Sequence, residues 1–419
     1  MRPEPTTSRR TRRWAAALLA GTLLLLLLAG ALLLLLLLLL APTLGRAGAG
    51  AGGVEQPTHP GRPLRGPAWA LTGPLQTMRF ALSVARLRDG RVLAVGGNSL
   101  IGGNLAPAEL YDPRTGRWAL TGPLHYRRLR PAAALLPDGR VLVVGGPYSS
   151  TAVAARAAET YAPRTGRWSL TRPMAVPMAL PGATATVLRG GTVLLLGDGA
   201  AQTFDPRTGR WTDLHVRPSF IGVDPAAVVL LHDGRVLVIN GYPSFVLEAV
   251  LYDPRTGRWT PTGRMPPDSG SAGEAVVLLH DGRVLVVGGI VGDSFAARAG
   301  AALYDPRTNR WTRAASPRQR RAEAVAETLP DGRVLLAGGG SQYVTPPSGV
   351  DACDLYDPRT NRWTATAPLH TPRALAAGTL LADGRVLVVG GTDLQNFLTA
   401  NGTRFSNDPL AREAEVFTP

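Results

Sequence analysis

Short apolar runs and tight-turn residues alternate along residues 67–419. Residues 131–136 are small and apolar, an Asp-Gly turn follows at 137–139, and Val141–Val144 is an uninterrupted apolar run. Asp-Gly provides the positive φ of a hairpin turn, and such an apolar run is typical of a strand buried on both faces. Two more strands are expected, at 158–161 and from Trp168 onward, joined by a Pro-Arg-Thr-Gly turn. The pattern predicts four antiparallel strands in one unit.

This unit is repeated along the chain. Copies or near copies of Tyr-Asp-Pro-Arg-Thr-Gly-Arg-Trp occupy residues 111–118, 161–168, 204–211, 252–259, 304–311 and 356–363. The tryptophans that open the expected outer strands are Trp69, Trp118, Trp168, Trp211, Trp259, Trp311 and Trp363, separated by 43 to 52 residues. Self-similarity of this period indicates stacked units that share one continuous core.

The two ends of the repeat are out of phase. The chain enters the repeat at Trp69, in an expected outer strand, and leaves it at 414–417, in an expected third strand. The first strand should therefore complete the last blade, which closes the ring and removes open sheet edges. We predict an all-β fold over residues 67–419, a closed β-propeller of seven blades.

The repeat resembles the kelch repeat, in which a Gly-Gly pair follows an apolar strand and is followed by Tyr and, after a turn, by Trp. The resemblance covers residues 67–419. It implies a β-propeller that usually binds partners, although the family also contains enzymes. The third repeat departs most, with Gly197-Asp198 for Gly-Gly and Phe204 for Tyr, and the fourth has Asn240-Gly241.

The N-terminal part has a different composition. Residues 1–13 form a basic flank, and residues 14–42 contain no charged side chain. Because about 20 apolar residues suffice to cross a bilayer, residues 14–42 are expected to be a transmembrane signal anchor. The arginines before the anchor predict a cytoplasmic N-terminus and an extracytoplasmic propeller, joined by a flexible tether at 43–66. The alternative is a cleaved signal peptide and a secreted propeller.

The net charge of +15 is of the kind found in nucleic-acid-binding proteins, but its distribution argues against such a partner. Much of the excess lies in the N-terminal flank and in the repeated turns, and these turns are dispersed around a ring. Nucleic-acid binding requires a localised basic face. We therefore expect the membrane as one partner and no nucleic acid, and the sequence does not indicate an oligomeric state.

A ligand site is expected on the face that carries the variable loops, because the Asp-Gly and Pro-Arg-Thr-Gly turns of the other face are uniform. In four blades an arginine precedes the expected innermost strand: Arg79, Arg130, Arg321 and Arg373. Neighbouring positions add Arg127, Arg128, Arg318 and Arg320. These eight residues are the candidate ligand-binding set, a partial ring around the channel mouth that would attract an acidic protein or glycan. The alternative is that each arginine binds loop carbonyls and holds neighbouring blades together.

Catalytic chemistry finds little support in the sequence. Galactose-oxidase-like members of the family use copper held by His, Tyr and a Tyr-linked Cys, with one ligand from a further domain. Here no two histidines have metal-ligand spacing, and Cys353 is expected to be a small buried residue. We predict no cofactor, no metal site and no catalytic residue. A binding module is favoured; a carbohydrate-active enzyme of an epimerase or lyase kind and a structural surface protein without a ligand are the alternatives.

Overall fold

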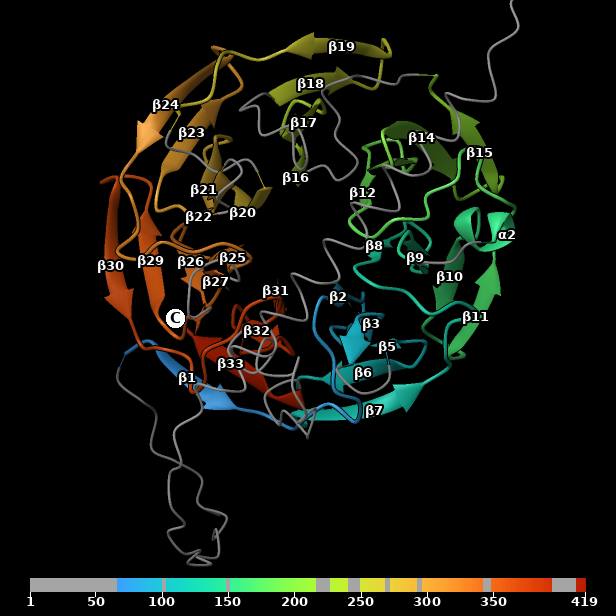
Figure 1. Cartoon of the computed structure of the whole chain (residues 1–419), viewed down its shortest axis with the longest axis horizontal. Helices are drawn as coiled ribbons and strands as arrows, with labels where there is room; N and C mark the ends of the chain where they lie inside the picture. The colour runs from blue at the N-terminus through green and yellow to red at the C-terminus, as the bar shows by residue number, and fades with distance from the viewer. Residues whose placement is uncertain are drawn as a thin grey trace, which may run out of the picture. The chain divides into compact units, whose positions relative to one another are not determined.

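The computed structural model describes residues 66–99, 103–147, 151–215, 227–239, 249–267, 272–291, 296–341, 348–393 and 412–419. Residues 63–419 belong to one compact unit. In this unit seven antiparallel sheets are arranged around a central channel (Figure 1). The predicted all-β, seven-bladed propeller is confirmed.

Every blade has four main strands in the order of the chain, from the channel outward, except at the closure, and a short fifth strand pairs within the fifth blade. The innermost strands are β2 (Ser83–Arg86), β8 (Ala132–Leu135), β12 (Thr184–Val187), β16 (Ala227–Leu230), β20 (Ala272–Leu278), β25 (Val325–Thr328) and β31 (Ala377–Leu380). The second strands are β3 (Val92–Val95), β9 (Val141–Val144), β13 (Val193–Gly197), β17 (Val236–Ile239), β21 (Val284–Val291), β26 (Val334–Ala337) and β32 (Val386–Val389).

The third strands are β6 (Ala108–Asp112), β10 (Glu159–Ala162), β14 (Ala200–Asp205), β18 (Ala249–Asp253), β23 (Ala301–Asp305), β29 (Cys353–Asp357) and β33 (Ala414–Thr418). The outermost strands are β7 (Arg117–Thr121), β11 (Arg167–Leu170), β15 (Arg210–Asp213), β19 (Arg258–Pro261), β24 (Arg310–Ala314), β30 (Arg362–Thr366) and β1 (Ala68–Leu71). Minor elements in the connections are β4 (Asn98–Ser99), β5 (Gly103–Asn104), α2 (Ala152–Ala155), β22 (Ala296–Ala297), β27 (Gly340–Ser341) and β28 (Ser348–Gly349).

The core lies between neighbouring blades. Each hydrophobic cluster draws side chains from two adjacent sheets; one of them joins Leu142 and Val144 of β9 to Val193 and Leu195 of β13. The second strands supply most of this apolar surface, and β3, β9, β17, β26 and β32 are buried at every position. The uninterrupted apolar runs therefore mark strands covered on both faces, as the sequence predicts.

The Gly-Gly pairs allow the second strand to bend where it meets the inner connection. Gly97 has a φ of 93°. A Cβ atom there would lie 2.7 Å from the carbonyl oxygen of Phe80. Gly339 and Gly391 make the same approach to Ala322 and Ala374, at 2.7 and 2.8 Å. Any side chain at these positions would both strain the backbone and collide with it.

The repeated tryptophans cover the outer part of each blade. Each lies against the aromatic residue of the third strand, with ring centroids 4.6 to 5.1 Å apart. Several indole N–H groups also donate to the preceding blade, as Trp168 does to the carbonyl oxygen of Gly122 at 2.6 Å. The outer strands thus contribute to contacts between blades as well as within them.

Ring closure joins the two ends of the propeller. Strand β1 pairs with β33, and Trp69 lies opposite Phe417. Their rings are 5.1 Å apart, and the indole N–H of Trp69 donates to the carbonyl oxygen of Ala367 at 2.9 Å. The seventh blade is therefore built from both ends of the repeat, as predicted.

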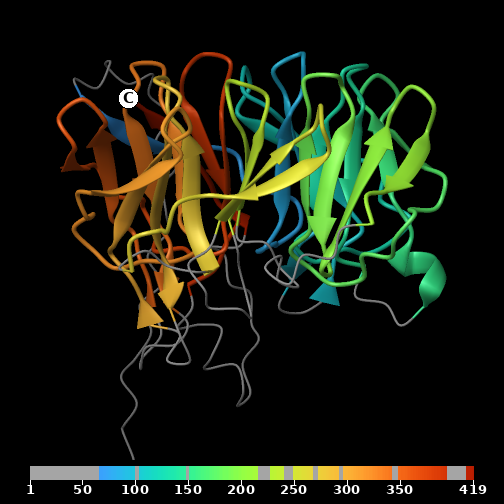
Figure 2. The same cartoon turned by 90° about the horizontal axis from the view of Figure 1, so that it is seen from above.

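The two faces of the ring differ (Figure 2). First-to-second and third-to-fourth turns lie together on one face, which we call the turn face. Second-to-third and blade-to-blade connections lie on the opposite face, the loop face. The predicted anchor at 14–42 lies outside the described residues, and no described helix is both long and apolar enough to cross a membrane.

We expect removal of residues 66–75 to destabilise the propeller strongly, because it exposes the edge of β33 and the Phe417 ring. A chain that lacks residues 1–75 should unfold with a free energy at least about 3–5 kcal/mol lower than one that lacks residues 1–65. Urea denaturation of the two chains measures the difference. Equal stabilities would contradict closure by β1.

Candidate functional site

Four arginines share one buried position in the blade-to-blade connections. Arg79, Arg128, Arg321 and Arg373 are at most 1% exposed. Each donates to the carbonyl oxygen of a glycine seventeen residues later: Gly96, Gly145, Gly338 and Gly390. Each also binds a carboxylate of the third strand of its blade, Glu109, Glu159, Asp354 or Glu415, at 2.7 to 3.1 Å.

These pairs fix the connection that enters each blade. The carboxylate of Glu109 also accepts the backbone N–H groups of Gln76 and Thr77, at 2.6 and 3.0 Å. Glu159 and Glu415 accept the N–H groups of His125 and His370, at 2.7 and 3.0 Å. A buried charge is costly unless it is paired and hydrogen-bonded, and here the pairing also ties the connection to the third strand.

Burial dominates the electrostatics of this position. Desolvation lowers the pKa of Arg79, Arg128 and Arg321, and their carboxylate partners oppose that effect. Desolvation likewise raises the pKa of Asp354, although the Arg321 charge acts in the opposite direction.

The expected ring of ligand-binding arginines therefore needs correction. Arg79, Arg321 and Arg373 do not line the channel mouth, because their guanidinium groups point into the blades and are buried. The equivalent residue of the second blade is Arg128 and not Arg130, since Arg128 makes the contact with Gly145. The arrangement matches the alternative interpretation, in which such arginines hold the connections.

Two residues after the buried arginine, the backbone turns left-handed at the channel mouth. Ala81, Arg130, Glu323 and Leu375 have φ values of 42° to 58°. Backbone hydrogen bonds link these positions between blades: Ala81 N to Leu375 O, Arg130 N to Ala81 O, and Glu323 N to Gly273 O, at 2.8 to 3.0 Å. Left-handed conformations are unusual for residues other than glycine. They persist where the surrounding structure enforces them.

One ion pair crosses the channel mouth. The guanidinium group of Arg130, in the connection before β8, donates to the Glu323 carboxylate, before β25, at 2.7 Å. β8 and β25 line opposite sides of the channel (Figure 1). Both side chains are about one-third exposed. The pair joins two connections that are 193 residues apart in the sequence.

Three further predicted residues lie exposed on these two connections. Arg127 is on the connection before β8, and Arg318 and Arg320 are on the connection before β25. Together with Arg130 they are the members of the predicted set that solvent can reach. Ligand binding by these four residues stays a prediction.

Glu274 is a buried acid that the sequence did not single out. It lies on β20 next to Gly273, is 9% exposed, and neither carboxylate oxygen has a hydrogen-bond partner among the described residues. Desolvation raises the pKa of its carboxyl group to about 8, and the nearby Glu323 charge adds to this. The sequence does contain one sign that Glu274 is unusual. When the repeats are aligned, five other blades have an uncharged residue at this position: Leu82, Pro131, Ala183, Ala324 and Ala376.

Glu274 and Glu323 are not arranged for access by a substrate. A protonated carboxyl group beside a second carboxylate is one basis for acid catalysis. The oxygens of Glu274, however, have almost no contact with solvent. A substrate could reach them only after a rearrangement of the mouth.

Cys353 is buried, and two of the histidines have local structural partners. Cys353 is 2% exposed, and desolvation raises the pKa of its thiol to about 12. His125 and His370 contact the buried acids Glu159 and Glu415 through Nδ1, at 2.8 and 2.6 Å. Within the described ranges, no three His, Cys, Asp or Glu side chains are grouped closely enough to hold a metal ion.

Comparison with curated proteins gives local matches to kelch proteins. No protein-family model matches the chain. Over 92 residues it is 37% identical to Kelch-like protein 36 of Rattus norvegicus and of Mus musculus. These matches cover 22% of this chain and 14% of each relative, so the chain corresponds to only a small part of their length.

Among solved structures, the propeller is similar to a fungal alcohol oxidase of the AA5 family in complex with copper. The TM-score is 0.67 at 19% sequence identity, over 85% of this chain and 77% of the oxidase. At this identity the similarity concerns the fold alone.

We expect replacement of Glu274 by Gln to change how stability depends on pH. The folded carboxyl group keeps its proton up to about pH 8, whereas the unfolded one loses it near pH 4.5. The folded state therefore binds more protons in this window, and its free energy of unfolding falls as the pH rises. Between pH 5 and pH 8 the free energy of unfolding of Glu274→Gln should therefore rise by about 1–3 kcal/mol relative to that of the wild type.

Denaturant titrations at several pH values measure this effect. Glu327→Gln is the comparison, because desolvation raises the pKa of that carboxyl group, on β25, only to about 7. The stability gained by Glu327→Gln should level off above about pH 7, whereas that gained by Glu274→Gln should keep growing to above about pH 8, because each gain levels off only above the folded pKa. Identical profiles for wild type and Glu274→Gln would show that Glu274 does not hold its proton.

Proposed function

Because the chain is a kelch-repeat β-propeller, we propose that it is an interaction module whose loop face binds an acidic segment of a protein or an acidic glycan. Kelch-type propellers are typical protein-interaction modules. The observation that carries the proposal is the exposure of Arg127, Arg318 and Arg320 on the two connections that the Arg130–Glu323 pair joins.

The chemistry of these side chains suits a carboxylate- or sulfate-bearing ligand. Guanidinium groups bind planar oxyanions through paired hydrogen bonds. The buried Arg128–Glu159 and Arg321–Asp354 pairs support the same two connections from below. Pre-ordered connections reduce the entropy that a ligand must remove on binding.

We expect the double variant Arg318→Ala/Arg320→Ala to weaken binding of a tetra-glutamate peptide or of polygalacturonate by about tenfold or more. The melting temperature should be unchanged, because both side chains are exposed. Arg128→Ala is the contrasting variant, which leaves Glu159 buried without its partner and should cost about 3–5 kcal/mol of stability.

Isothermal titration and thermal unfolding separate the two effects. The matched control is Arg258→Ala, an exposed arginine of the turn face. Equal loss of binding in the control and in the double variant would mean that general charge attraction, and not a loop-face site, holds the ligand.

We also propose that residues 14–42 anchor the chain in the cell membrane, with the N-terminus cytoplasmic and the propeller outside. The support is the uncharged segment itself and the arginines at positions 9, 10, 12 and 13 that precede it.

Protease treatment of intact cells tests this topology. The propeller should be removed from the membrane fraction by external protease, while a tag fused before residue 1 should stay protected. Recovery of a shortened chain from the medium would assign the segment to a cleaved signal peptide and the propeller to the secreted fraction. Protection of the propeller from external protease would contradict both the anchored and the secreted arrangement.

A further inference from the structure

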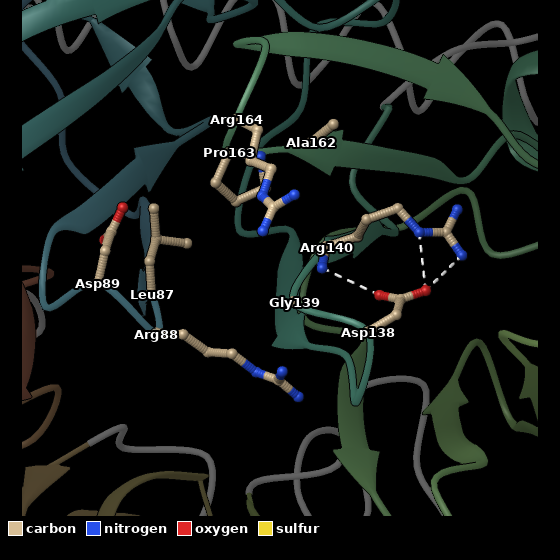
Figure 3. Close-up of a pocket in the computed structure, with 9 residues that line it drawn as sticks. All are labelled: Leu87, Arg88, Asp89, Asp138, Gly139, Arg140, Ala162, Pro163 and Arg164. Carbon is tan, nitrogen blue, oxygen red and sulfur yellow. Dashed lines mark hydrogen bonds and ion pairs between the residues drawn. The ribbon is translucent and has the colours of Figure 1, made fainter.

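A groove on the turn face, between the first two blades, lacks an aspartate that the repeated phrase supplies to its counterparts. It has a volume of about 460 Å³, and its charged lining residues are Arg88, Asp89, Asp138, Arg140 and Arg164. Ala162, Pro163, Leu87 and Gly139 complete the lining (Figure 3). Three arginines thus face two aspartates.

Two corresponding grooves elsewhere have the opposite balance. Between the fifth and sixth blades, the same positions hold three aspartates and two arginines: Asp281, Asp331, Asp357, Arg333 and Arg359. Between the last and first blades they hold Asp383, Asp89, Asp112, Arg91 and Arg114. The first groove is therefore more positive than these two grooves by two charges. The groove between the third and fourth blades, with Arg189, Asp233, Arg235, Asp253 and Arg255, has the same balance as the first but keeps its aspartate at the position of Ala162.

Two independent departures from the repeat produce this difference. Arg88 occupies a turn position that is Arg189 in the third blade and Pro137, His232, His280, Pro330 or Ala382 in the others. Ala162 stands where the other five repeated phrases have Asp. Both changes add positive charge, and the fold brings them to the same groove.

The missing aspartate leaves the donors of one arginine without their usual acceptor. In the first blade, Asp112 accepts the backbone N–H of Arg114 at 3.0 Å and pairs with its guanidinium group at 3.1 Å. In the second blade, Ala162 offers no such oxygen, and Arg164 has no ion-pair partner among the described residues. The guanidinium group of Arg164 lies between Asp89 and the Asp138–Arg140 pair (Figure 3).

The two aspartates of the groove are already paired. Asp138 holds Arg140 at 2.7 Å, and Asp89 holds Arg91 at 2.7 Å. Arg91 also donates to the carbonyl oxygen of Pro163, which fixes the outer turn against the first blade. The guanidinium group of Arg88 donates to the carbonyl oxygen of Pro137. Arg164, which is exposed, is therefore the arginine left to interact with a group from outside.

We propose that this groove binds the carboxylate of an acidic peptide, which takes the place of the aspartate absent at position 162. The carboxylate would accept hydrogen bonds from the backbone N–H and guanidinium group of Arg164, and Arg88 would contribute a second positive charge. The site is on the face opposite to the loop-face arginines and is independent of the function proposed for them.

The test uses the full chain in neutral detergent, with the Arg318→Ala/Arg320→Ala background to remove binding at the loop face. The probe is a fluorescently labelled tetra-glutamate peptide, followed by anisotropy at low ionic strength. Ala162→Asp supplies the internal carboxylate that five other phrases already have, so it should fold normally. It is expected to weaken binding at least about tenfold, and Arg164→Ala should do the same.

Arg255→Ala is the matched control, because Arg255 has the same place in the fourth blade and keeps its partner Asp253. It should leave the affinity unchanged. The proposal is overturned if the background chain shows no saturable binding, if Ala162→Asp binds as tightly as its parent, or if Arg255→Ala loses as much affinity as Arg164→Ala. A phosphoserine peptide that binds more tightly, with the same sensitivity to Ala162→Asp, would overturn the carboxylate assignment in favour of phosphate.

Discussion

Burial of each blade against the next is the constraint on which this structure depends. No sheet has an apolar core of its own, because the side chains of the second strands are covered by the neighbouring blades on both sides. A blade with only one neighbour would leave one of these faces in water. The pairing of β1 with β33 follows from this requirement, since it completes the seventh blade and leaves none uncovered.

The polar network complements that core. Apolar packing between sheets is not directional, whereas a buried arginine must meet its carboxylate and carbonyl partners with defined geometry. The pairs Arg79–Glu109, Arg128–Glu159, Arg321–Asp354 and Arg373–Glu415 therefore fix the connections at the loop face. Those connections in turn place Arg130 and Glu323 at the channel mouth, in a backbone conformation that few residues adopt without support.

Both candidate binding regions lie where copies of the repeat differ. At the loop face, Arg130, Glu323 and Glu274 occupy positions that are small or apolar in other blades. On the turn face, Ala162 removes from one groove an aspartate that the other repeated phrases supply. The uniform residues form the scaffold, and departures from them at adjacent blades combine into a site because the ring brings those blades together.

The sequence alone determined the number of blades, the strand order and the closure, because turn residues and apolar runs act locally and recur with a fixed period. It also contained every arginine of the predicted set, but it could not distinguish Arg128 from Arg130. Two residues of displacement decide whether a side chain points into a blade or across the channel, and only the tertiary structure fixes that register. The Arg130–Glu323 pair and the burial of Glu274 were likewise beyond the sequence. They depend on contacts between residues distant along the chain, which no local pattern records.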